Sequence, residues 1–392
     1  MARLTFVTWD GGGNVAPAVG IAQELASRGH EVRFAGYEQQ RIRFEALAFE
    51  FSPLRRSGGF DIDPAQAPLE RLAAVTRNVW ACPEHPDDLT DLVAENPTDL
   101  VVVDFSMQGA LAWGEVATVP VVALAHSTIT GLVPPPDSPV GAARLSATND
   151  LRAGAGLQAL TRLNDGWARL STLVTTIPEL DPASETASAS LVYVGPIAQR
   201  TGAAAWADPW DAGDTRPLVL VSFSTTRFWD QTSRVRNTLA GLADQPVRVL
   251  VSGAEPTEVG EVPDNAVVRP FVPHGLVLST AAVTVTHCGH GTVTSSLAHG
   301  VPLVGLPNPA ADQPYLARRI EELGAGIALE GESDPATISR AVRAVLDQAA
   351  YREAASVLAE RIAAAPGAAG AATELEMRAS AAATVAARGC AR

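Results

Sequence analysis

The sequence predicts an α/β protein with two domains, and three observations support this prediction. The chain has 392 residues, of which 47% are hydrophobic, so two cores of ordinary size can be buried. It opens with an apolar strand, a helix with apolar residues at helical spacing and a second strand. Its second half contains another such alternation around a glycine-spaced turn at 287–292. We therefore expect two Rossmann-like domains with parallel sheets.

The first domain is expected over residues 1–200, followed by a linker over 201–217 in which Ala, Gly, Asp and Pro accumulate. The predicted strands of this domain are Leu4–Thr8, His30–Ala35, Leu100–Val103, Val119–Ala125 and Thr172–Thr176. Its predicted helices are Pro17–Arg28 and Leu69–Trp80, with more helix over 140–170. Residues 218–375 are expected to form the second domain, with strands at Leu218–Phe223, Arg248–Ser252 and Ala281–Thr286. Residues 376–392 are expected to form a C-terminal tail or helix.

Three polar residues of the first domain, Asp10, Asp104 and His126, each follow a predicted strand. Ligands of open α/β sheets bind beyond the carboxyl ends of strands, so we expect these side chains to face one crevice. Taken singly, each is better explained as a loop-capping or solvated polar residue.

The turn after the first strand offers a rival interpretation, a dinucleotide site. Gly11 and Gly13 supply G-x-G, and Glu38 lies beyond the second strand. However, Ala16 occupies the third glycine position and Pro17 follows it. We therefore do not favour a dinucleotide role.

A second turn, His287–Thr292, follows the strand predicted at Ala281–Thr286 and leads into a helix predicted at Val293–His299. Such a turn directs free backbone N–H groups and the positive end of a helix at one place. Its small residues let an anion approach the backbone closely. The turn predicts a phosphate site, although a packing role alone would also explain its glycines.

Residues 271–313 closely resemble the nucleotide-sugar signature of the family 1 glycosyltransferases. In that signature an aromatic-x-Pro element leads to His-x-Gly-x-Gly-Thr, then to Gly-Val-Pro and Asp-Gln. The matching residues, in order, are Phe271, Pro273, His287, Gly289, Gly291, Thr292, Gly300, Val301, Pro302, Asp312 and Gln313. The resemblance covers nearly the whole chain and is strongest in its second half. It implies the GT-B fold, in which two facing domains hold the active site in the cleft between them.

The resemblance also implies how a nucleoside diphosphate sugar would be held. Phe271 would stack on the pyrimidine, and the backbone near Val272 would read the edge of the base. His287 and the backbone N–H groups of Gly291 and Thr292 would hold the diphosphate, whose negative charge grows in the transition state. This division of roles needs no metal ion or other cofactor.

Further contacts implied by the resemblance involve the sugar and the distal phosphate. Asp312 and Gln313 would hydrogen-bond the sugar hydroxyls, and Thr225 would contact the distal phosphate. Many UDP-sugar users carry a glutamate for the ribose hydroxyls where this chain has Ser295. Because deoxyribose lacks the 2′-hydroxyl, we hypothesise a dTDP-sugar donor, with UDP-sugar as the alternative.

The first loop departs from the family pattern Gly-His-Val-x-Pro, in which the histidine removes the proton of the acceptor. Here Asn14 replaces that histidine. A neutral amide can hold a hydroxyl but cannot take its proton. We therefore expect His126, or less favourably Asp10, to act as the base in an inverting transfer, with Asp104 orienting a partner. Alternatively, the acceptor is acidic enough to need little help.

Composition excludes several other classes. The net charge of −14 argues against nucleic acid and anionic membranes as partners. All basic residues are arginine, so a Walker A loop and a Schiff-base lysine are excluded. The three cysteines, Cys82, Cys288 and Cys390, fit neither a disulfide framework nor a CxxC metal site. The tripeptide Asp61-Ile62-Asp63 is interpreted as a chance D-x-D match. We expect no metal, no export signal and a cytoplasmic location.

The resemblance within the family is closest to bacterial glycosyltransferases that decorate antibiotics of the macrolide, enediyne and indolocarbazole types. The expected partners are therefore a nucleotide-sugar donor and a small hydrophobic aglycone. Apolar residues that could line a pocket for a flat aglycone, or simply pack in the core, are Trp80, Met107, Trp113, Val133 and Trp167. Two alternatives remain: a non-catalytic relative that binds nucleotide or activates a partner, and a sugar-nucleotide epimerase. Whether the chain forms a homodimer is left open.

Overall fold

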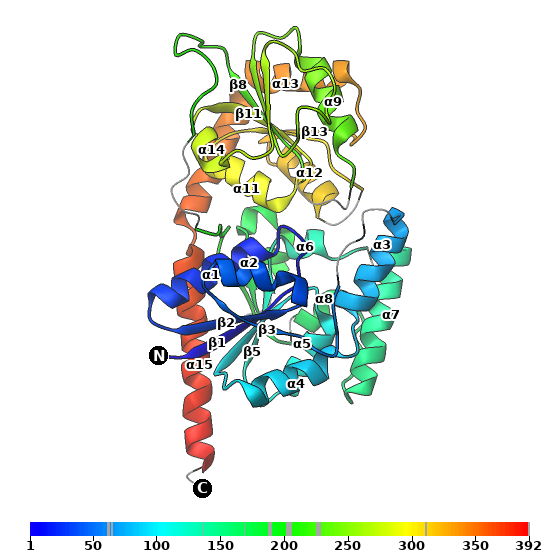
Figure 1. The fold of residues 1–392 in the computed structure, drawn as a ribbon, viewed down its shortest axis with the longest axis vertical. Helices are drawn as coiled ribbons and strands as arrows, with labels where there is room; N and C mark the ends of the chain where they lie inside the picture. Colours follow the sequence, from blue (N-terminus) through cyan, green and yellow to red (C-terminus); the bar gives the residue numbers. More distant parts are fainter. Residues whose placement is uncertain are drawn as a thin grey trace. The chain divides into compact units, whose positions relative to one another are not determined.

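The computed structural model describes residues 1–392 except 61–62, 64–65, 136, 168, 187–189, 201–205, 225–228, 310–311 and 391–392, with the backbone alone for 68, 186 and 382–390. Within this range the chain forms two compact units. Unit 1 contains residues 1–200 and 366–392, and unit 2 contains residues 201–365. Both units are built on parallel sheets, as predicted (Figure 1).

The sheet of unit 1 has seven parallel strands in the order β3-β2-β1-β4-β5-β6-β7. The strands are β1 (Arg3–Val7), β2 (Glu31–Gly36), β3 (Glu50–Pro53), β4 (Leu100–Asp104), β5 (Val121–Ala125), β6 (Ser171–Val174) and β7 (Leu191–Tyr193). The central strands β4 and β5 are buried at every position, which explains their unbroken apolar sequence. The chain order reverses between β1 and β4, so unit 1 has its topological switch point there.

Helices cover both faces of this sheet, and in Figure 1 the strands lie between α1 and α2 on one side and α4 on the other. The helices of unit 1 are α1 (Val15–Ser27), α2 (Arg41–Ala46), α3 (Pro68–Val75), α4 (His85–Glu95), α5 (Gln108–Gly114), α6 (Ile129–Leu132), α7 (Pro139–Gly154), α8 (Leu163–Trp167) and α15 (Gly367–Cys390). The helix predicted at Leu69–Trp80 is α3 followed by one π-helical turn, Thr76–Trp80.

The C-terminal helix α15 belongs to unit 1, and the structure assigns the chain to this unit from Pro366 onward. Ala371, Ala372 and Leu375 are fully buried in the core that also contains residues of α1. Glu376 adds an ion pair to Arg28 at 3.1 Å. The sequence prediction begins the tail at residue 376, but the buried apolar positions before it already pack on unit 1.

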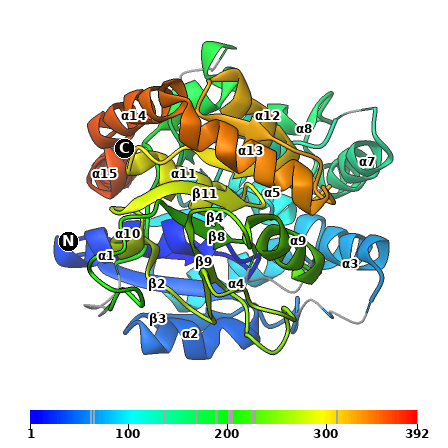
Figure 2. The same ribbon diagram turned by 90° about the horizontal axis from the view of Figure 1, so that it is seen from above.

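Unit 2 has a six-stranded parallel sheet in the order β10-β9-β8-β11-β12-β13. Its strands are β8 (Leu218–Ser222), β9 (Arg248–Ser252), β10 (Ala266–Arg269), β11 (Ala281–Thr286), β12 (Leu303–Gly305) and β13 (Gly326–Ala328). Its helices are α9 (Thr232–Leu242), α10 (His274–Val277), α11 (His290–Ala298), α12 (Gln313–Glu322), α13 (Pro335–Asp347) and α14 (Ala349–Ala364). Helix α13 packs along β11, β12 and β13 (Figure 2). The switch point of this sheet lies between β8 and β11.

Candidate functional site

The loop between β1 and α1 in unit 1, residues 9–14, is closed by the side chain of Asn14. Its amide nitrogen donates to the backbone oxygen of Trp9 (2.8 Å) and to Asp104 Oδ2 (2.7 Å). Its amide oxygen accepts from the N–H of Gly11 at 3.0 Å. Asn14 is 2% exposed, so these bonds form away from water. Both polar atoms of the amide therefore have partners within the protein.

Asp104, at the carboxyl end of β4, anchors this loop from the neighbouring strand. Its Oδ1 accepts from the N–H and the hydroxyl of Ser106, and Ser106 Oγ accepts from Trp9 Nε1 at 2.7 Å. Its Oδ2 accepts from Asn14. The structure thus brings two of the predicted residues, Asn14 and Asp104, into one buried network at the switch point of unit 1.

The other two residues predicted for acceptor chemistry, Asp10 and His126, lie outside this network. Asp10 is exposed, and its carboxylate pairs with Arg43 at 3.1 Å. His126 follows β5, the strand next to β4, and its ring lies 5.1 Å from that of Phe105. Its Nδ1 is buried and has no hydrogen-bond partner within the described residues.

In unit 2 the turn after β11 is shorter than predicted, because α11 begins at His290 and not at Val293. Gly289 is extended and serves as the N-cap without a side-chain hydrogen bond, which ends the turn early. Gly291 and Thr292 therefore lie in the first helical turn, where backbone N–H groups have no partner within the helix. A side chain added at Gly291 would meet no atom within 4 Å, so the space beside this turn is open.

His287, at the end of β11, lies against the turn and is 7% exposed. A Cβ at Gly289 would come within 2.5 Å of His287 Nε2, so the ring occupies the space that this glycine leaves free. Burial lowers the pKa of His287 to about 4; a backbone hydrogen bond with Ser222 opposes this shift and the charge of Arg234 adds to it. The imidazole is therefore neutral near pH 7 and donates from one nitrogen only.

The Asp-Gln pair lies at the start of α12. Asp312 is 7% exposed, and its charge, after burial, is the second cause that raises the pKa of the Cys288 thiol. Asp312 therefore lies close enough to Cys288, in the turn, for its charge to act on the thiol. Gln313 Oε1 accepts from both the backbone N–H and the side-chain amide of Asn308, at 3.0 and 2.9 Å.

The remaining predicted donor residues differ in exposure. Phe271 follows β10 and is 74% exposed, whereas Val272 beside it is buried at 1%. An exposed aromatic face next to a fixed backbone segment has the form of a stacking platform. Thr225 lies outside the residues that the structure describes.

Sequence reasoning missed three residues of these two networks: Trp9, Ser106 and Asn308. Trp9 and Ser106 complete the closed loop of unit 1, and Asn308 holds Gln313. Asn308 is fully buried, two residues beyond the apolar Leu306. Their position in the sequence could have indicated them, because each follows a predicted or short strand by a few residues.

The aromatic and apolar residues considered for an aglycone pocket are mostly core residues. Trp80, Met107, Trp113 and Trp167 are between 0% and 7% exposed, and Val133 is half-buried. Trp80 Nε1 donates to Thr148 Oγ1 at 3.0 Å, and Trp113 Nε1 donates to Thr90 Oγ1 at 3.1 Å.

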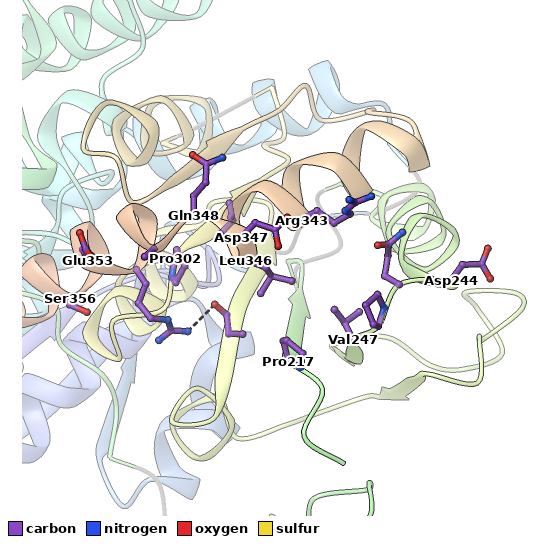
Figure 3. Close-up of a pocket in the computed structure, with 16 residues that line it drawn as sticks. Pro217, Asp244, Val247, Pro302, Arg343, Leu346, Asp347, Gln348, Glu353 and Ser356 are labelled. Atoms are coloured by element: carbon purple, nitrogen blue, oxygen red, sulfur yellow. Dashed lines mark hydrogen bonds between the residues drawn. The ribbon is translucent and has the colours of Figure 1, made fainter. Parts of the chain in front are cut away.

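A cavity of about 1260 Å³ lies at the amino-terminal ends of the strands in the unit 2 sheet (Figure 3). Its lining includes Pro217, Val247 and Pro302, each directly before a strand. Arg352 in its wall donates to the backbone oxygen of Ala282 at 2.9 Å. Ligands of such sheets bind at the carboxyl ends of strands, so this cavity is separate from the predicted donor site.

The described residues contain no group of three His, Cys, Asp or Glu side chains placed to hold a metal ion. Asp61 and Ile62 of the D-x-D tripeptide fall outside that range. No helix in the described part of the chain has the length and apolarity needed to cross a membrane.

Comparison with known proteins gives consistent matches. The family model described as "Erythromycin biosynthesis protein CIII-like, C-terminal domain" matches residues 236–377. The chain is 29% identical to 4'-demethylrebeccamycin synthase of Lentzea aerocolonigenes over 93% of this chain and 96% of that protein. It is 30% identical to demethyllactenocin mycarosyltransferase of Streptomyces fradiae over 83% of this chain and 75% of the relative.

The fold is likewise similar to that of solved structures. The glycosyltransferase VinC in complex with dTDP superimposes with a TM-score of 0.73 and 20% identity, over 96% of this chain and 99% of that one. The arrangement of two units with parallel sheets is the GT-B fold predicted from the sequence.

Proposed function

Because the chain belongs to the GT-B glycosyltransferases of antibiotic biosynthesis, we propose that it transfers a deoxysugar from a dTDP-sugar to a hydroxyl or amine of a natural-product aglycone. The observation that carries the donor assignment is the uncapped first turn of α11, with open space at Gly291. Among the alternatives considered from the sequence, an epimerase and a non-catalytic nucleotide-binding protein, neither is retained, since the relatives are transferases.

The diphosphate is assigned to this turn because its N–H groups and the helix dipole favour an anion there. Neutral His287 would add one donor without a charge of its own. In the transfer, the bond between the anomeric carbon and the diphosphate oxygen breaks, and negative charge grows on the leaving group. Donors fixed before the reaction stabilise that charge more in the transition state than in the bound substrate.

The nucleotide is assigned as dTDP on two grounds. Ser295 stands where a carboxylate would hold both ribose hydroxyls, and a solved structure of the same fold contains dTDP. Phe271 would stack on the thymine, which explains an aromatic ring that is 74% exposed. Calorimetry with dTDP and UDP tests this assignment, and UDP binding at least as tightly as dTDP would overturn it.

The acceptor is assigned to unit 1, and its attack opposite the diphosphate would invert the anomeric centre. Asn14 cannot serve as the base, since an amide does not titrate and both its polar atoms are engaged. We assign proton removal to His126, whose Nδ1 has no partner among the described residues, or to an acceptor acidic enough to attack as its anion. A His126→Ala variant with unchanged turnover across pH would exclude the first route.

We also propose that the transfer proceeds without a metal ion. The first turn of α11 and His287 would stabilise the negative charge of the diphosphate instead. Turnover is then expected to be unchanged by a chelator, measured as nucleotide release with and without EDTA. Loss of activity in EDTA, restored by Mg²⁺, would contradict this part.

The decisive experiment incubates the protein with dTDP-sugars and UDP-sugars, with and without an aromatic aglycone, and measures nucleotide release and product linkage. Release that requires the aglycone, with an inverted linkage in the product, is expected. Release without any acceptor, or conversion of the sugar without transfer, would contradict the proposed reaction.

A further inference from the structure

Arg144 on α7 is a half-buried cation without a counter-ion among the described residues. Its guanidinium carbon lies 4.3 Å from the ring centroid of Trp80, at the end of the π-helical turn that packs against α7. Within the described residues it makes no ion pair or hydrogen bond, and its Nε is buried and unpartnered. Burial alone lowers the pKa of the Arg144 guanidinium, to about 10, with no carboxylate close enough to oppose the shift. The charge is therefore retained at pH 7 but poorly solvated.

Arg152, two turns later on the same helix, shows how this chain normally treats a buried guanidinium. It is 2% exposed, both of its terminal nitrogens donate to the carboxylate of Glu115, and its Nε donates to the backbone oxygen of Gln158 at 2.7 Å. Buried charges are usually paired because removing them from water is costly. Arg152 follows this rule and Arg144 does not.

Trp80 connects Arg144 to a group of rings that we call the aromatic cluster: Trp80, Phe105, His126 and Trp167. The ring of Phe105 lies 6.2 Å from Trp80, 5.1 Å from His126 and 5.3 Å from Trp167. Two polar atoms of this cluster, His126 Nδ1 and Trp167 Nε1, are buried without a partner among the described residues.

Two of the unpartnered atoms share one chemical property. Arg144 Nε and Trp167 Nε1 can only donate a hydrogen bond, whereas His126 Nδ1, the atom assigned to proton removal, accepts. Buried polar groups without partners are rare in native proteins, and the two donors here lack acceptors. A guanidinium stacked by its face on an indole keeps its N–H groups free in its own plane, where a carboxylate binds with two parallel hydrogen bonds.

We propose that Arg144 and the aromatic cluster recognise an acceptor that is planar and aromatic and carries a carboxylate. The inference rests on the proposed function and adds the chemical class of the acceptor. Arg144 binds the carboxylate of the acceptor. Arg144 and His126 are both partly exposed, so the acceptor can reach them from solvent. The buried rings of the cluster hold these two side chains in place and fix the shape of the site. Arg144 acts in recognition and touches no reacting atom.

The test uses two probes of the same shape, 2-naphthoate and its neutral amide 2-naphthamide, titrated against the full chain by tryptophan fluorescence and ligand-observed NMR. The wild-type protein is expected to bind naphthoate at least ~10-fold more tightly than naphthamide, with a preference that weakens at high salt. Arg144→Met should abolish the preference, and Arg144→Lys should keep part of it. The matched control Arg55→Met removes an exposed arginine, 68% accessible, and should leave the preference unchanged.

Equal affinity of the wild-type protein for the two probes would overturn the proposal, as would a preference that persists in Arg144→Met. Because Arg144→Met removes a half-buried charge that has no counter-ion among the described residues, its thermal unfolding midpoint should equal or exceed that of the wild type. If that variant nevertheless fails to fold, the wild-type preference and Arg144→Lys decide the question.

Titration of dTDP into the same samples separates this inference from the proposed function. Binding of dTDP with no preference for naphthoate contradicts the acceptor class alone. Absence of dTDP binding contradicts the donor assignment, whatever the naphthoate result.

Discussion

Two strand-end loops of this protein, residues 9–14 in unit 1 and 287–292 in unit 2, border a topological switch point, the first after the first strand of its sheet and the second after the fourth. Each follows a strand beside the switch point of a parallel sheet and leads into a helix. In unit 1 the Asn14 side chain fills the loop and bonds it to Asp104. In unit 2 no side chain caps α11, and the space at Gly291 is open. A loop beside a switch point is thus closed by its own side chain in unit 1 and left open in unit 2.

In both loops, the side chains decide whether the free polar groups of the loop are satisfied within the protein. A polar side chain of suitable length satisfies the free groups of its own loop, and no ligand is then required. Small residues leave those groups for a ligand. We therefore expect substitutions in the 287–292 turn to change turnover, and substitutions around Asn14 to change stability.

The largest expected effect comes from His287→Ala in the open turn. Removing one donor from a site of developing negative charge typically lowers kcat by ~10²–10³-fold. His299→Ala, at the far end of the same helix, is the control, since His299 bonds the Ser295 carbonyl within that helix end. Steady-state kinetics with a dTDP-sugar measures both variants. A kcat of the His287→Ala variant within a factor of two of the wild-type value would contradict a role for this turn in catalysis.

Acid should weaken both units, because each buries a histidine whose pKa is lowered to about 4, His85 in unit 1 and His287 in unit 2. The unfolded chain takes up protons near pH 6.5 and the folded chain only near pH 4. Stability is therefore complete above about pH 6.5 and falls as the pH drops towards 4, by about 3 kcal/mol for each site.

Urea unfolding at pH 7.5 and 4.5 measures this acid effect. His85→Gln, which keeps a polar group for Tyr37, should flatten the pH dependence of the unit 1 transition alone. An unchanged slope for that transition would show that His85 is not the group responsible.

In the closed loop, Asp104→Ala should destabilise unit 1 by about 1–3 kcal/mol, because it leaves the buried Asn14 amide and Ser106 without their acceptor. Asp10→Ala is the matched control, since its carboxylate is exposed and its partners among the described residues are the surface residue Arg43 and the N–H of Gly12 in its own loop. Thermal unfolding measures both. Equal midpoints for the two variants would mean that the network does not hold the loop.

The smallest expected effect is the most direct comparison of the two loops, Gly291→Ala against Gly13→Ala. Neither added methyl group meets an atom within 4 Å, so both variants should fold with unchanged midpoints. Gly291→Ala should weaken dTDP binding by roughly 10-fold, equivalent to about 1.4 kcal/mol, because the methyl group enters the space assigned to the diphosphate. Gly13→Ala should bind dTDP like the wild type, and calorimetry distinguishes them.

Much of this fold could be predicted because the central strands are long and apolar. The prediction for β9 and β11 has the observed bounds, and the other predicted strands agree within two residues at each end. The short strands β3, β7, β10, β12 and β13, all at a sheet edge except β12, were not predicted, since three or four residues are too few to show periodicity. The early start of α11 was also missed, because Gly291 and Thr292 are poor helix formers in isolation.

By itself, the sequence determined the fold class, the family and the position of the donor signature, because strand periodicity and turn chemistry depend on neighbouring residues. Only the tertiary structure decided which polar side chains are already satisfied and which are not. Asn14 and Asp104 are 90 positions apart and Arg144 and Trp80 are 64 apart, yet each pair is in contact. Contacts of that kind form only when parallel strands and their helices pack, so no local pattern reports them.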